Sequence, residues 1–115
     1  MGKGVLNEKS FRFATRIVGL YKYLHEKKEY VLSKQILRCG TSVGAQVREA
    51  EFAESANDFI HKLAVAQKEC NETLYWLELL KETAYLEKEY FDSINQDAIE
   101  LIKILTAIIK TSKAK

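Results

Sequence analysis

The chain has 115 residues, of which 47% are hydrophobic and 30% charged, and its net charge is +2. This is enough chain to bury one core, and the composition is typical of a single soluble domain. No stretch approaches the roughly 18 apolar residues of a membrane-spanning helix, and the N-terminus lacks the apolar run of a signal peptide, so we expect a cytoplasmic protein with no membrane partner.

Long helices are favoured because the chain contains no proline and only five glycines. The first predicted helix covers about residues 10–27. Apolar residues at spacings of four, three and four form its core face: Phe13, Ile17, Leu20 and Leu24. Further apolar residues are expected to widen that face: Phe11, Ala14, Val18 and Tyr21. The other side carries a basic stripe: Lys9, Arg12 and Arg16.

The second predicted helix covers about residues 30–51 and contains two glycines one turn apart, Gly40 and Gly44. Glycine costs roughly 1 kcal/mol relative to alanine inside a helix, so the pair suggests that another backbone approaches closely there. A helix break at Gly40 is the alternative. We prefer a continuous helix, because the apolar spacing keeps its phase across both glycines.

The third predicted helix covers about residues 55–84, with Ser55 as its N-cap and Asp58 three residues further on. The fourth covers about residues 88–111, and nine of the twelve residues from 98 to 109 are apolar. A helix that is apolar nearly all round is buried on more than one side. In a chain of this size we expect that the second side contacts another subunit.

Three short loops join these helices, around residues 28–29, 52–54 and 85–87. Short connections make consecutive helices antiparallel neighbours. We therefore predict an all-α fold, a single-domain antiparallel four-helix bundle with up-down-up-down topology.

Three segments resemble one bacterial family: TSVGAQVREA (41–50), DFIHKL (58–63) and KECNETLYWLELL (68–80). The likeness is to bacterial four helix bundle proteins known as intervening-sequence proteins of large-subunit ribosomal RNA genes, and it covers about residues 11–111. The family usually has Asn-Ile where this chain has Gln46-Val47. The resemblance implies a homo-oligomer, typically a five-fold ring, whose molecular role is largely unassigned. A related protein, the accessory subunit of diversity-generating retroelements, is taken to bind nucleic acid and a reverse transcriptase through a basic surface.

Enzyme chemistry finds little support in the sequence, and we predict no catalytic residue, no metal site and no cofactor. Cys39 and Cys70 match neither a redox pair nor a zinc half-site, and we expect two buried thiols. His61 follows Asp58 by three residues, which suits a surface polar pair better than a ligand held by a carboxylate. Trp76 suits packing better than base stacking.

The charge is distributed unevenly: residues 1–48 carry +7, residues 49–100 carry −9, and residues 101–115 carry +4. Such asymmetry is typical of a nucleic-acid-binding face, but it also arises where a basic helix pairs with an acidic neighbour. The first hypothesis is therefore a homo-oligomer, most simply a pentamer, that binds RNA or DNA through these residues: Lys9, Arg12, Arg16, Lys34, Arg38 and Arg48. The alternative is an oligomeric scaffold or adaptor that binds another protein, with the cations paired to Glu69, Glu72 or Glu78.

Overall fold

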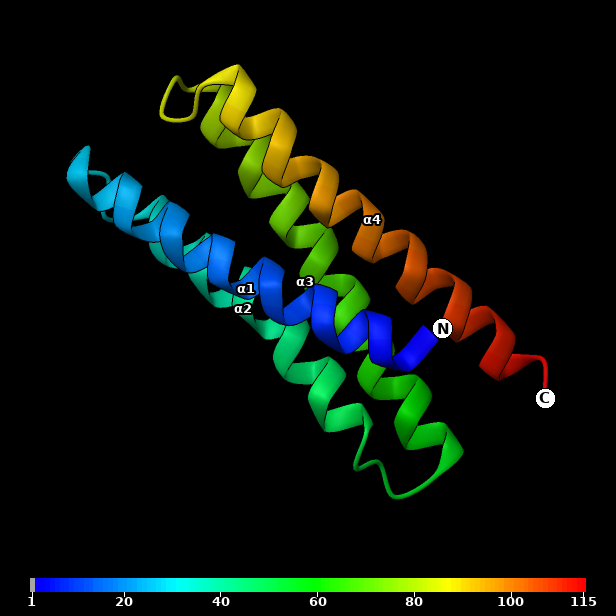
Figure 1. Ribbon diagram of the computed structural model, residues 1–115. Coiled ribbons are helices and arrows are strands. Elements are labelled where there is room, and N and C mark those ends of the chain that lie inside the picture. The colour runs from blue at the N-terminus through cyan, green and yellow to red at the C-terminus, as the bar shows by residue number, and fades with distance from the viewer. Residues whose placement is uncertain (1) are drawn as a thin grey trace.

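A computed structural model describes residues 2–115 of the chain, with the side chains of residues 4–115. Its elements are four helices: α1 (Gly2–Glu26), α2 (Leu32–Ala50), α3 (Ala56–Glu82) and α4 (Lys88–Lys113). They run up, down, up and down, and the described residues contain no β-strand (Figure 1). The predicted all-α, antiparallel four-helix bundle is confirmed.

Helix α1 begins earlier than the sequence predicts, at Gly2 rather than near residue 10. The reason is Leu6, which is only 2% exposed and continues the core face of Phe13 and Leu20 at a spacing of seven residues. Burial of this side chain stabilises the extra turns of α1, although glycines lower the helix propensity of the segment. The other helix ends lie within two residues of their predicted positions.

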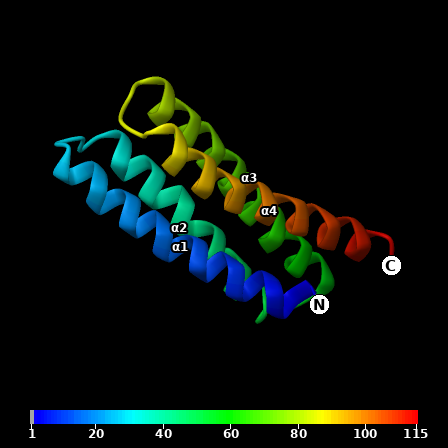
Figure 2. The same cartoon turned by 45° about the horizontal axis from the view of Figure 1, so that its top comes forward.

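The helices occupy the corners of a square, so that each packs against two neighbours (Figures 1 and 2). Helix α3 lies between α2 and α4, and the contact between α1 and α4 is the smallest of the four sides. All four helices contribute to the largest fully buried side chains: Leu6, Phe13, Ile17, Leu20, Leu24, Ile36, Leu63, Leu77, Leu80, Ile94, Leu101 and Leu105. The bundle measures 47 × 21 × 19 Å.

Left-handed residues end two of the helices. Lys28 after α1 has φ 63°, and Ala84 after α3 has φ 67°. This conformation turns the chain back, so that the N–H of Glu29 donates to the carbonyl of Leu24 at 2.9 Å, and an equivalent bond closes α3. These abrupt ends keep the connections after α1 and α3 short.

Glu29 caps the start of α2. Its buried carboxylate accepts hydrogen bonds from the backbone N–H groups of Val31, Leu32 and Ser33 at 3.1, 2.9 and 2.6 Å. Burial alone would raise the pKa of Glu29, but the three donors stabilise the charged form more, and the pKa lies below the ordinary value of 4.5. The cap therefore stabilises the fold above about pH 4.5, and this contribution is lost as the pH falls through the lower folded-state pKa.

The predicted cap of α3 is also present. The hydroxyl of Ser55 accepts a hydrogen bond from the backbone N–H of Asp58 at 3.0 Å, and the Asp58 carboxylate accepts one from the N–H of Glu54 at 3.1 Å. Ser55 thus satisfies a donor that the first turn leaves unpaired, and Asp58 bonds the residue before the cap.

Helix α2 continues through both of its glycines, and each faces α1. A β-carbon at Gly40 would lie 2.7 Å from Cγ1 of Ile17, and one at Gly44 would lie 3.1 Å from the carbonyl oxygen of Ser10. The prediction that another backbone approaches closely is confirmed at Gly44, where the nearest atoms belong to the main chain of α1.

We expect Gly44→Leu to destabilise the bundle, because the added side chain must push the α1 backbone away. Overpacking of this kind typically costs about 1–3 kcal/mol. The measurement is the melting temperature by circular dichroism, with Gly19→Leu as the matched control, since nothing lies within 4 Å of a β-carbon at Gly19. Equal melting temperatures for the two variants would contradict the close crossing.

Candidate functional site

Two cations of the predicted basic stripe tie α1 to α4. Nζ of Lys9 lies 3.1 Å from a carboxylate oxygen of Glu100, and Nη1 of Arg16 lies 2.8 Å from one of Asp97. Both pairs are partly exposed and lie along the smallest helix contact of the bundle. These two cations therefore already form ion pairs within the protomer.

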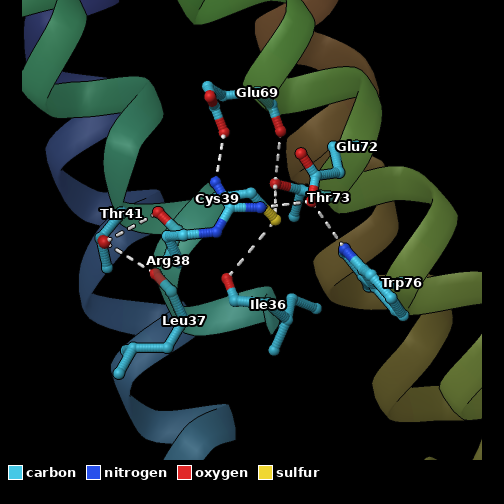
Figure 3. A network of polar contacts seen from close by, with 9 residues as sticks. All are labelled: Ile36, Leu37, Arg38, Cys39, Thr41, Glu69, Glu72, Thr73 and Trp76. Atoms are coloured by element: carbon cyan, nitrogen blue, oxygen red, sulfur yellow. Dashed lines mark hydrogen bonds and ion pairs between the residues drawn. The ribbon is translucent and has the colours of Figure 1, made fainter. Parts of the chain in front are cut away.

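Arg38 ties α2 to α3, as the scaffold alternative expected. Its guanidinium contacts Glu69 at 3.4 Å and Glu72 at 2.5 Å, and Nε1 of Trp76 donates to the same Glu72 oxygen at 3.0 Å (Figure 3). Trp76 is half-buried and packs against the core. Trp76, with its N–H bonded to Glu72, packs between helices, whereas its neighbour Tyr75 is 58% exposed.

The other three predicted cations are exposed and form no ion pair with any of the described side chains: Arg12, Lys34 and Arg48. The guanidinium of Arg48 lies over the ring of Phe11, 5.7 Å from its centroid. Lys34 lies near the opposite end of α2, about 21 Å along the helix from Arg48 at 1.5 Å per residue. The structure thus divides the six cations between three that join helices and three that remain available.

The cysteines lie in the core, as predicted, and both are free thiols. Burial raises the pKa of Cys39 to about 11 and that of Cys70 to about 12. Thr73 donates its hydroxyl hydrogen to the sulfur of Cys39 at 3.2 Å (Figure 3), and the Cys70 thiol donates to the carbonyl of Ala98 at 3.3 Å. Protonated, enclosed thiols are poor nucleophiles and poor metal ligands. In the described part of the chain, no three His, Cys, Asp or Glu side chains are grouped to hold a metal ion.

The apolar surplus of α4 is covered more fully than the sequence suggests. Ile94 and Ile109 are buried, and the remaining isoleucines are half-buried: Ile99, Ile102, Ile104 and Ile108. Three of these four pack against the protomer's own core. The reasoning that assigned one side of α4 to another subunit therefore loses much of its basis.

The large apolar side chains that are exposed lie elsewhere, and sequence reasoning missed them. They are Phe11 (57%), Val18 (37%), Tyr30 (51%), Val31 (71%), Phe52 (84%) and Tyr75 (58%). Phe11 and Val18 do not widen the core face of α1 as predicted, because both side chains are exposed, and Phe11 lies against Arg48 of α2. Their spacing of seven residues was the available signal, since it places both on one stripe of the helix.

An open groove follows the outward side of the α1–α2 hairpin. Its volume is about 800 Å³, and small residues of both helices line it, among them Ala14, Gly44 and Ala45. Charged residues around the α2–α3 turn and the start of α3 complete the lining: Glu49, Glu54, Asp58 and Lys62. Phe11, Arg48 and Phe52 lie along its edges. We refer to the following residues as the α1–α2 face: Phe11, Ala14, Val18, Lys34, Thr41, Ala45 and Arg48.

We expect Arg16→Glu to lower the free energy of unfolding by about 1 kcal/mol, since it removes a partly exposed ion pair and opposes two carboxylates. Adding Asp97→Arg should restore most of the loss. Arg12→Glu is the matched control, and it should change stability by less than about 0.5 kcal/mol. Denaturant unfolding measures all three variants, and similar losses for Arg12→Glu and Arg16→Glu would show that the pair with α4 contributes nothing.

None of the four helices has a segment long and apolar enough to cross a bilayer, as judged over the described residues. No curated protein sequence matches the chain. The family model described as 23S rRNA-intervening sequence protein matches residues 5–107. A crystal structure of a protein of unknown function from the S23 ribosomal protein family of Bacteroides thetaiotaomicron is 58% identical, with a TM-score of 0.94, and the match covers 96% of this chain and 99% of that one. The chain therefore belongs to the 23S rRNA-intervening sequence protein family.

Proposed function

We propose that this protein is a non-enzymatic, homo-oligomeric helical scaffold, assembled as the five-fold ring that the family resemblance implies. The protomers associate through apolar surface, and the assembly presents its remaining surface to another macromolecule. The observation that carries the proposal is the concentration of exposed large apolar side chains on one half of the protomer.

Five of the six such side chains found in the described chain lie between residues 11 and 52. Single exposed apolar residues are normal on a protein surface, but contiguous ones mark interaction sites. On the α1–α2 face, Phe11 lines the groove, and Val18 is exposed seven residues further along α1. An aromatic and aliphatic centre with cations at its edges is the composition of a protein–protein interface.

The ion pairs favour a scaffold over a nucleic-acid-binding protein. Lys9, Arg16 and Arg38 already neutralise carboxylates of the same protomer. A phosphate backbone would have to compete with those carboxylates for the cations. Phe11 and Val18 of the α1–α2 face, in contrast, remain 57% and 37% exposed in the protomer.

We expect the protein to have a mass several times that of its 13.2 kDa chain in sedimentation velocity and light scattering. The double variant Phe11→Glu with Val18→Glu should be a folded monomer, because it places two charges in an apolar contact. The matched control is Ser93→Glu with Gln96→Glu, which adds the same charge at two exposed positions of α4. A wild-type monomer would contradict the proposal, as would a double variant with undiminished mass.

A second candidate function is nucleic-acid binding, which the three unpaired cations Arg12, Lys34 and Arg48 favour. Repetition of weak contacts around an oligomer would add by multivalency. Arg16 is a poor choice for testing this idea, because its replacement would disturb the contact with Asp97.

If the second function holds, Arg12→Glu with Arg48→Glu should abolish binding of structured RNA or duplex DNA and leave the oligomer intact. The measurement is fluorescence anisotropy at two salt concentrations, since affinity for phosphates falls steeply with salt. Loss of the oligomer would assign these cations to assembly. Wild-type protein that binds neither nucleic acid would remove this candidate.

A further inference from the structure

We infer that the surface where α1 meets α4 binds the phosphate backbone of a nucleic-acid duplex. The inference rests on nucleic-acid binding, the second candidate function, and assigns it to a surface that includes only one of the three cations named there, Arg12. We refer to the following residues as the α1–α4 face: Lys9, Arg12, Arg16, Lys103 and Lys110.

The two ion pairs between α1 and α4, which lie side by side (Figure 2), fix the position of this face. Lys9 contacts Glu100 at 3.1 Å, and Arg16 contacts Asp97 at 2.8 Å. Arg12 lies three residues after Lys9 and four before Arg16, so all three are on the same side of α1. It is exposed and forms no ion pair with any described residue. An unpaired guanidinium therefore lies beside α4.

Helix α4 adds two further cations. Lys103 lies three residues after Glu100, and Lys110 lies two turns further along the same side of the helix. Both lysines are exposed, and neither forms an ion pair with a described side chain. At 1.5 Å per residue they are about 10 Å apart along α4, a length over which each strand of a duplex carries about three phosphates.

The acidic side chains near this face do not cancel its charge. Its two carboxylates on α4 are already paired with cations of α1. Glu8, one turn before Arg12, is exposed and is the unpaired carboxylate nearest to it along α1. Five cations against three carboxylates leave a net charge of +2 on each protomer. Glu89 lies about 21 Å from Lys103 along α4, and no acidic residue follows Glu100 in the sequence.

The chemistry of the α1–α4 face suits phosphates better than an acidic protein. The large apolar side chains that are exposed in the described chain all lie outside this face. A protein–protein interface is built around such side chains, whereas contacts to a phosphate backbone need only cations and hydrogen-bond donors. Gln96 and Thr111 of α4 are exposed and can supply further donors. Because these contacts do not read base edges, the binding should be independent of sequence.

The test compares two double variants that remove the same charge from different surfaces. Lys103→Gln with Lys110→Gln should lower the affinity for duplex RNA and duplex DNA about tenfold or more at low salt. It should also reduce the slope of log affinity against log salt by about two. Lys22→Gln with Lys34→Gln is the matched control, because it removes two exposed, unpaired cations of the α1–α2 hairpin, and it should leave affinity and slope unchanged.

Fluorescence anisotropy with short labelled duplexes measures the affinities, and circular dichroism checks that both double variants are folded. A competition arm uses polyglutamate at the same concentration of charge as unlabelled duplex. Polyglutamate should displace the labelled duplexes poorly, because a duplex carries one charge per about 1.7 Å of its axis. Displacement as effective as that by unlabelled duplex would overturn the inference in favour of an acidic protein partner.

The outcomes separate this inference from the function on which it rests. A wild-type protein that binds neither duplex would overturn the second candidate function, and this inference with it. If the wild type binds, an unchanged affinity for Lys103→Gln with Lys110→Gln would overturn this inference alone. An equal loss of affinity in the control would do the same, because it would place the duplex on no particular face.

Discussion

The close crossing of α1 and α2 is the constraint on which the rest of the structure depends. Gly44 lets the backbone at Ser10 approach to a distance that a methyl group would obstruct, and Gly40 makes room for Ile17. This approach turns the core side of α1 inward and leaves Phe11 outside, under the guanidinium of Arg48. Gly44 also lines the groove, so its lack of a side chain both permits the close packing and shapes the candidate interface.

Charge performs two separate tasks in this bundle. One set of cations joins helices across the protomer, from α1 to α4 and from α2 to α3. Exposed pairs of this kind add little stability each, so they select which helices become neighbours more than they hold them together. The second set remains exposed on the α1–α2 hairpin. The uneven charge along the sequence thus reflects ion pairs between helices in part, and in part exposed cations that pair with no described acidic side chain.

The sequence predicted what depends on local spacing and failed where distant neighbours decide. Core faces, the Ser55 cap and the continuity of α2 follow from residues within a few turns of one another. The early start of α1 does not, because only the surrounding core reveals that Leu6 has a place to pack. The ion-pair partners of the basic stripe could not be predicted either, because Lys9 and Glu100 are separated by 91 residues in the sequence. Orientation of Phe11 depends likewise on how much of α1 its neighbours cover.

The small contact between α1 and α4 has a consequence for motion. The first and last helices meet there, and the contact includes two partly exposed ion pairs. Salt weakens the attraction within such pairs. Local opening of a protein starts where few apolar contacts must be broken. Local opening should therefore separate α1 from α4, and amide hydrogen exchange should be faster in these two helices than in the α2–α3 pair.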